Sequence, residues 1–143
     1  MAGYSATPLP KKLGIKEHSR IAFVNAPKDF EGYLGLLPSG VEVIKRLNKF
    51  TSRKPLDIIL LFVTAERALA RDFAKLTEQL ATNGMIWIAW PKKSSGVATD
   101  LSFASVQRTG LDAGLVDVKI CAVDETWSGL KFVFRLKDRK TRS

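Results

Sequence analysis

The sequence predicts a three-layer α/β fold, in which helices cover both faces of a mainly parallel sheet of about six strands. Two observations predict it. Short apolar segments alternate along the chain with segments whose apolar residues recur at helical spacing. Two of the short segments, 20–26 and 57–63, are almost wholly apolar, which is typical of strands that helices cover on both faces. The expected order of elements is β-α-β-β-α-β-α-β-β, and the last strand closes an antiparallel hairpin.

The first half of the chain contains a short helix and three larger expected elements. They are a short helix within 7–14, a strand over 20–26, a helix over about 28–37 and an alternating strand over 41–47. Leu9, Leu13 and Ile15 are expected to pack the first helix against the body of the protein. The connection 48–55 is shorter than a parallel crossover normally needs. Either it runs extended across the sheet, or strand 41–47 lies at an edge with unusual pairing.

The second half of the chain alternates more regularly between strand and helix. The expected elements are a strand over 57–63, a helix over 65–82, a strand over 85–90, a helix over about 103–113, and strands over 117–123 and 130–136. The buried stripe of the long helix is Leu69, Phe73, Leu76 and Leu80. Thr64 is expected to cap this helix and Asn83-Gly84 to end it, whereas Ser102 caps the next helix and Gly114 ends it.

The composition is that of an ordinary globular protein and excludes some chemistry. The 143 residues predict one domain, with residues 1–19 as an extension, 20–136 as the core and 137–143 as a basic tail. No apolar run approaches the roughly 18 residues of a membrane helix, and the N-terminus lacks a secretory pattern, so a cytoplasmic location is expected. Cys121 is the only cysteine and His18 the only histidine, which argues against zinc sites and a Ser-His-Asp triad.

The net charge of +9 predicts anionic partners. A small anionic molecule is the partner that we expect. Nucleic acid is an alternative, through Lys49, Arg53, Lys54 and the basic tail, although no aromatic RNA-binding platform or helix-turn-helix pattern supports it. No membrane partner is expected. The protein is expected to be a monomer, or a homodimer paired through strand 41–47 or strand 130–136.

Polar side chains follow the expected strands where ligands bind in open α/β sheets, beyond the carboxyl ends. The candidate ligand-binding residues are Asn25, Thr64, Lys92, Lys93, Ser94, Ser95, Asp124, Glu125 and Trp127. The two lysines can hold a phosphate or carboxylate, with the serines adding donors. The alternative is a solvated basic turn. For Asp124 or Glu125 an ion pair with one of these lysines is favoured over a general base, and Trp127 is interpreted as a cover of the sheet edge.

Residues 56–136 resemble the C-terminal half of the class I S-adenosylmethionine methyltransferase fold, which is Rossmann-like, in their order of strands and helices. The first half departs from that family. The segment 25–30, Asn-Ala-Pro-Lys-Asp-Phe, lacks the glycine-rich cofactor loop that follows the first strand. The segment 45–48, Lys-Arg-Leu-Asn, lacks the acidic residue at the end of the second strand. We therefore expect no cofactor, with S-adenosylmethionine as the alternative.

Over nearly its whole length the chain also resembles a small bacterial family, a domain of unknown function of the DUF3052 type. The segments that carry this resemblance are 3–5, 8–14, 87–93, 114–119 and 124–128. The resemblance implies a bacterial cytosolic protein and assigns no functional residues.

The sequence therefore favours a non-enzymatic or degenerate methyltransferase-like module for binding or regulation, with an anion-binding corner at the carboxyl edge of the sheet. One alternative is a small transferase for a ligand with a phosphate or carboxylate, using loop 92–95 and either Asp124 or Glu125. The other is a basic protein associated with nucleic acid.

Overall fold

The structure is a computed structural model that describes residues 7–45 and 54–142. Predictions for residues 1–6, the end of strand 41–47, Lys49 and Arg53 lie outside the described residues. Within the described part of the chain, no helix is long and apolar enough to span a membrane.

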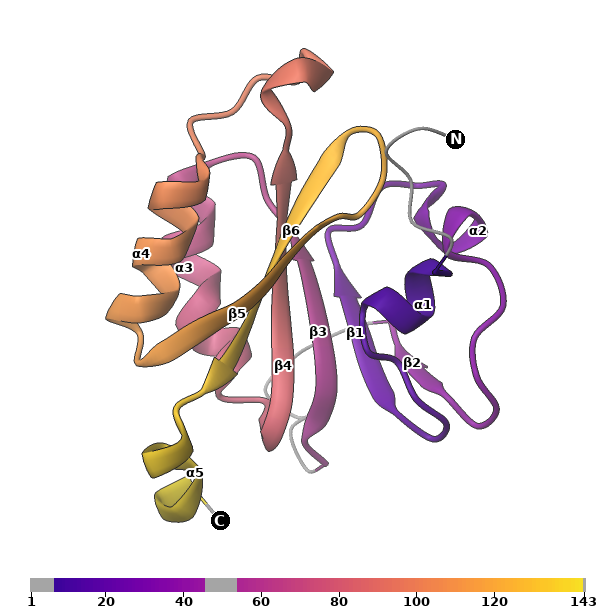
Figure 1. Ribbon diagram of the computed structural model, residues 1–143, viewed down its shortest axis with the longest axis vertical. Helices are drawn as coiled ribbons and strands as arrows, with labels where there is room; N and C mark the ends of the chain where they lie inside the picture. Colours follow the sequence, from indigo (N-terminus) through magenta and orange to yellow (C-terminus); the bar gives the residue numbers. More distant parts are fainter. Residues whose placement is uncertain (1–6, 46–53, 143) are drawn as a thin grey trace.

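The core of the protein is a six-stranded sheet in the order β2-β1-β3-β4-β6-β5 (Figure 1). Its strands are β1 (Arg20–Val24), β2 (Glu42–Ile44), β3 (Leu56–Phe62), β4 (Leu80–Pro91), β5 (Leu115–Ala122) and β6 (Trp127–Phe134). Strands β1 to β4 are parallel to one another, whereas β6 runs antiparallel to both of its neighbours, β4 and β5. This confirms the predicted fold class, a mainly parallel α/β sheet with a C-terminal antiparallel hairpin.

Helices cover both faces of the sheet. They are α1 (Leu9–Lys12), α2 (Phe30–Leu34), α3 (Glu66–Thr77), α4 (Phe103–Asp112) and the terminal α5 (Leu136–Arg142). Because side chains alternate along β3, Ile59 and Leu61 pack in the cluster with α3 and α4, whereas Ile58 and Leu60 pack in the cluster with α1 and α2. The buried Leu13 confirms that the first helix packs onto the sheet.

The long helix ends earlier than the sequence predicted. Helix α3 stops at Thr77, and Asn83-Gly84 lies inside β4 rather than at a helix end. The register between β3 and β4 shifts between Leu56 and Ile58, which pair with Leu80 and Met85. A Cβ at Gly84 would lie 3.0 Å from three backbone carbonyl oxygens. The glycine therefore permits an irregularity within a strand. In the local sequence, Asn83-Gly84 has the same pattern as the end of a helix.

The start of α3 also differs from the prediction, because its cap comes from a distant loop. Ala65 is the N-cap, and the backbone N–H of Glu66 donates to Asp100 Oδ1 at 2.7 Å. Thr64 does not cap the helix; its carbonyl oxygen accepts a hydrogen bond from Thr99 Oγ1 at 2.5 Å. For α4 the prediction holds, since Ser102 forms a reciprocal capping box with Ser105.

Strand β2 lies at one edge of the sheet with regular parallel pairing to β1. Val43 pairs with Ile21, and Arg20 forms an ion pair with Glu42 directly opposite it. The second alternative is therefore right about the edge position, but the pairing is not unusual; the first alternative concerns the connection 48–55, most of which lies outside the described residues. At the other edge lies β5, because β6 is inserted between β4 and β5. The segment 130–136 is thus not an edge available for pairing.

The segment predicted as a basic tail lies in α5 as far as Arg142. The Arg139 guanidinium donates from Nε to the carbonyl oxygen of Phe134 at 3.1 Å, and the backbone N–H of Asp138 donates to Arg135. These bonds continue the chain from the end of β6 into a helical turn.

Candidate functional site

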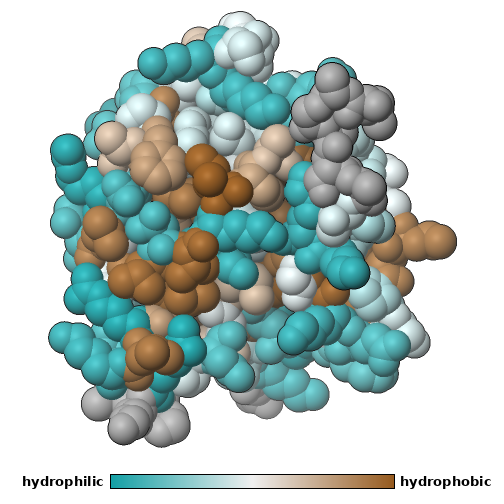
Figure 2. Space-filling model, viewed as in Figure 1, coloured by the Kyte–Doolittle hydropathy of each residue, from teal (hydrophilic) through white to brown (hydrophobic). Residues whose placement is uncertain are grey.

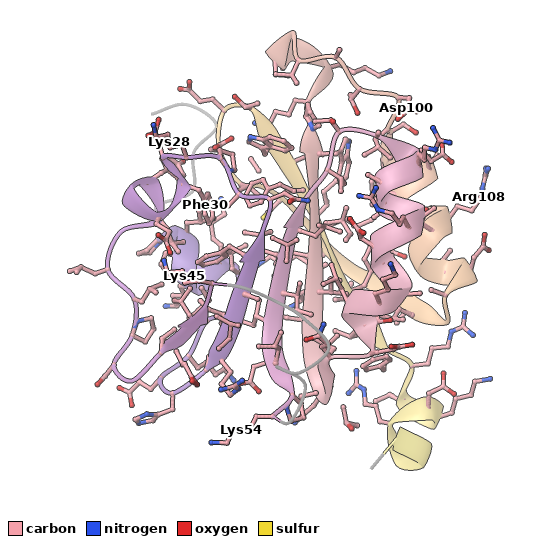
Figure 3. The ribbon with its side chains drawn as sticks, turned by 180° about the vertical axis from the view of Figure 1, so that it is seen from behind. Lys28, Phe30, Lys45, Lys54, Asp100 and Arg108 are labelled. Atoms are coloured by element: carbon pink, nitrogen blue, oxygen red, sulfur yellow. The ribbon has the colours of Figure 1, made fainter. Side chains whose placement is uncertain are left out.

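A pocket of about 340 Å³ opens at the carboxyl ends of β1 and β2. Its lining residues are Phe23, Asn25, Ala26, Pro27, Lys28, Glu31, Val43, Ile44 and Lys45. In the sheet, β1 has β2 on one side and β3 on the other, so the chain reverses its direction of progress across the sheet at β1. Open α/β sheets with this strand order bind ligands at the β1/β3 switch point, and the pocket lies beside that point because β1 borders both. Figure 3 shows the labelled Lys28 and Lys45 on the side of the molecule where α2 and β2 lie.

The loop between β1 and α2 forms one wall of this pocket. Asn25 follows β1 directly and has a φ of 59°, in the left-handed region that asparagine tolerates better than most residues. Beyond the loop, the buried Phe30 packs edge-to-face on Phe23 and on Phe62, with ring centroids 5.2 and 5.0 Å apart. These rings hold α2 on the sheet, and so they fix the position of the loop.

The charged groups of the pocket are two lysines and one glutamate. Lys45 Nζ lies 2.5 Å from Glu31 Oε1, and the two side chains are 69% and 55% exposed. Ion pairs at such exposure contribute at most about 1 kcal/mol, so a ligand can replace this one. Lys28 is exposed and adds a second ammonium group. The pocket therefore carries an excess of positive charge.

The structure brings some of the predicted site residues together. The backbone N–H of Lys92 donates to the carbonyl oxygen of Thr126 at 2.8 Å, and Trp127 pairs with Pro91. Loops 92–95 and 124–127 are therefore neighbours, as expected. Of the candidate residues, Asn25 lines the pocket described above, whereas Thr64 is tied to Thr99.

The polar groups of these two loops shape their own turns. Ser95 Oγ donates to the carbonyl oxygen of Lys92 at 2.7 Å and accepts from the backbone N–H of Val97. Asp124 Oδ1 accepts from the backbone N–H groups of Thr126 and Trp127, both at 2.8 Å. Within the residues that the structure describes, Asp124 forms no ion pair with Lys92 or Lys93. Lys93, Ser94 and Glu125 are exposed.

Trp127 is half-buried and packs on the end of β3. Its ring meets Phe62 edge-to-face, with centroids 5.1 Å apart. Together with Phe23 and Phe30, these rings form a continuous aromatic row beneath the carboxyl edge of the sheet. Trp127 thus packs as the cover that its position predicted.

The three charged residues of the pocket were missing from the sequence-based candidates: Lys28, Glu31 and Lys45. Lys45 was missed because alternation continues to Leu47 in the sequence, whereas β2 ends at Ile44. The signal that could have found Lys45 is the rule that residues directly after a parallel strand lie at the ligand-binding edge. Glu31 had no such signal, since only the packing of α2 brings it to Lys45.

No protein-family model and no curated protein matches the sequence, so the resemblance to the DUF3052 type gains no support. Solved structures do match. A S-adenosylmethionine-dependent methyltransferase from Aquifex aeolicus is 16% identical over 85% of each chain, with a TM-score of 0.58. The fibrillarin pre-rRNA processing protein of Methanococcus jannaschii is 14% identical over 92% of this chain and 70% of its own, with a TM-score of 0.59.

A third match is a ribosomal protein L11 methylase from Lactobacillus delbrueckii, 10% identical over 89% of this chain and 75% of its own, with a TM-score of 0.58. Identities this low establish the fold alone. The protein has the Rossmann-like fold of S-adenosylmethionine-dependent methyltransferases, as the order of its elements predicted.

Proposed function

We propose that the pocket at the carboxyl ends of β1 and β2 binds a nucleotide, and that the protein is a binding module built on the methyltransferase fold. One observation carries the proposal: Lys45 directly follows β2 and shares the pocket with Lys28. Ammonium groups hold phosphate oxygens by charge-assisted hydrogen bonds. The volume of about 340 Å³ lies in the range of small-molecule sites. The half-buried Phe23 and Val43 add apolar surface for a base.

S-adenosylmethionine fits these residues poorly in the usual mode. In dinucleotide-binding sites of related architecture, a carboxylate near the end of the second strand accepts hydrogen bonds from ribose hydroxyls. Lys45 stands at that place, and an ammonium group can only donate. The sulfonium of S-adenosylmethionine would also bring a positive charge toward Lys28 and Lys45. A phosphate group is negative, so the two lysines attract it instead of repelling it.

A methyltransferase is the second candidate function, and two observations favour it. The solved structures that match include a S-adenosylmethionine-dependent enzyme. In addition, Asn25 adopts the left-handed conformation that a glycine after β1 would adopt without strain. In this reading Glu31 leaves Lys45 and accepts the ribose hydroxyls. The two candidates therefore differ in the charge that they require at position 45.

Calorimetric titration of the protein with AMP, inorganic phosphate and S-adenosylmethionine distinguishes the nucleotide-binding module from the methyltransferase. We expect AMP to bind, and Lys28→Ala and Lys45→Glu each to weaken its binding by about tenfold or more, because each removes a charged hydrogen-bond donor. Lys93→Ala is the matched control, since it removes a lysine at the same edge of the sheet outside the pocket lining. It should leave the affinity for AMP unchanged.

Two results would contradict the proposal. If S-adenosylmethionine binds, AMP does not, and Lys45→Glu strengthens S-adenosylmethionine, the methyltransferase candidate is correct. If AMP binding falls in Lys93→Ala and persists in the two pocket variants, the site is the loop 92–95 that the sequence predicted.

A further inference from the structure

Strand β5 is an edge strand with exposed apolar side chains. No strand of the described part of the chain pairs with its outer side, so alternate backbone N–H and C=O groups there face away from β6. Val118 and Ile120 are 52% and 54% exposed. In Figure 2, apolar residues gather over the region of β5, bordered by hydrophilic ones. Such an edge is a template for an additional strand.

One face of this edge is basic. Lys119 lies directly opposite Lys131 of β6, which in turn lies directly opposite Trp87 of β4. Paired residues share a face, so the three side chains form one row that ends at the edge. Lys131 Nζ lies 5.8 Å from the ring centroid of Trp87. Burial, and next the charge of Lys119, lower the pKa of Lys131.

This row has no acidic member. No ion pair between residues that the structure describes includes Lys119 or Lys131. Like charges directly opposite each other destabilise a sheet, and a carboxylate beside Lys119 would relieve this. The thiol of Cys121 is next on this face, and burial raises its pKa although Lys12, Lys119 and Lys131 lie near. Cys121 therefore does not supply the missing negative charge at neutral pH.

The adjacent row of the sheet points to the opposite face and is apolar. Ile120 pairs with Leu130, and Leu130 pairs with Ile88. The first two rows after the bulge at Asp117/Lys119 therefore alternate in chemistry, a basic position on one face and an apolar position on the other. A strand added beyond β5 would place its own side chains in these two rows in turn.

We propose that β5 binds an extended segment of a partner protein in which acidic and apolar residues alternate. The backbone of the segment adds a seventh strand to the sheet, its acidic side chains meet Lys119, and its apolar side chains cover Ile120. This is the strand-addition mode of peptide recognition. A second copy of β5 is disfavoured in the register centred on Lys119, near the middle of the strand, because that register brings both Lys119 side chains together.

A labelled peptide of alternating Glu and Val, about eight residues long to match β5, tests this by fluorescence polarisation. We expect it to bind, and a Lys-Val peptide of the same length to bind at least about tenfold more weakly. Backbone N-methylation of alternate residues on the pairing side should abolish binding, since it removes the ladder hydrogen bonds and leaves the charges.

Charge reversal supplies the sharper test. Lys119→Glu should weaken the Glu-Val peptide by about tenfold and strengthen the Lys-Val peptide, whereas Ile120→Thr should weaken both. Lys75→Glu is the matched control, because it reverses an exposed lysine on α3 and should change neither affinity. Residues 119 and 120 are exposed, so these variants are expected to fold normally.

Three outcomes would overturn the inference. Equal binding of the N-methylated peptide would mean that the patch attracts acidic chains without strand pairing. Displacement of the peptide by a short RNA duplex, at equal charge, would mean that a nucleic acid is the preferred occupant. Concentration-dependent dimers in sedimentation that Lys119→Glu disrupts would mean that a second copy occupies β5.

Discussion

At Gly110, helix α4 lies so close to β6 that no side chain fits between them. A Cβ at this position would lie 2.0 Å from Cε1 of Phe132. Phe132 cannot move aside easily, because it is fully buried and packs edge-to-face on Phe73 at 5.7 Å. Helix α4 can therefore lie this close to the sheet only because the residue facing Phe132 is a glycine.

Gly110→Ala is expected to lower the free energy of unfolding by up to roughly 2 kcal/mol. Alanine gains about 1 kcal/mol of helix propensity, but overpacking a filled core typically costs about 1–3 kcal/mol and shifts the ring as well. Urea denaturation measures the difference. Gly32→Ala on α2 is the control, since nothing lies within 4 Å of its Cβ, and it should be neutral or stabilising. Equal effects of the two changes would contradict the argument.

At neutral pH the charge of Lys131 lowers the stability of the folded protein, and a neutral side chain at this position should restore that stability. Lys131→Met keeps contact with Trp87 through its thioether and ends the repulsion from Lys119, so we expect a gain of a few tenths of a kcal/mol. The pKa of Lys131 is lowered in the folded state, so between that pKa and the ordinary 10.5 the unfolded chain binds more protons.

The stability of the wild type should therefore rise with pH through this window, and the advantage of Lys131→Met should shrink. Denaturation curves between neutral pH and pH 10.5 measure the difference between the two proteins. Lys75→Met on the exposed face of α3 is the control and should show no such dependence. An advantage that stays constant with pH would mean that repulsion is not its source.

At the scale of elements, the loop before α4 stabilises the start of α3. The carboxylate of Asp100 accepts from the backbone N–H of Glu66, the first residue of α3, and so satisfies one of the free N–H groups that N-cap side chains usually serve. Figure 3 shows Asp100 beside the end of this helix. A hydrogen bond thus joins α3 to the loop that leads into α4, in addition to the packing of the two helices.

Asp100→Ala should lower the free energy of unfolding by about 1 kcal/mol, the usual loss for a removed cap. Asp100→Asn should lose less, because the amide oxygen still accepts. Asp112→Ala is a matched control at the C-terminal end of α4, where a carboxylate is unfavourable, so its removal should not destabilise. Thermal and urea unfolding report all three. A loss in Asp112→Ala as large as that in Asp100→Ala would point to general charge effects instead.

At the scale of the whole molecule, the two proposed sites lie at opposite edges of one sheet. The pocket is at the ends of β1 and β2 and the peptide-binding edge is β5, with β3, β4 and β6 between them. A ligand at one site does not contact the other. The experiments on Lys45 and on Lys119 are therefore independent, and the failure of one leaves the other standing.

The fold class, most elements and the cap of α4 followed from the sequence by itself, because they depend on local periodicity and on residues a few positions apart. Ser102 and Ser105 are an example. Tertiary structure alone decided where α3 ends, since Asn83-Gly84 serves a strand irregularity against Leu56 and Asp57 of β3. It also decided that Asp100 caps α3.

The same division holds for the candidate sites. The sequence by itself predicted a ligand site at the carboxyl ends of the strands and named Asn25, which lines the pocket, because strand direction determines that edge. Only the tertiary structure revealed the pocket with Lys28, Glu31 and Lys45, and made β5 the open edge. The reason is physical: which strand ends leave a hollow, and which strand lies outermost, depends on contacts between residues far apart in the chain, and these leave no local pattern.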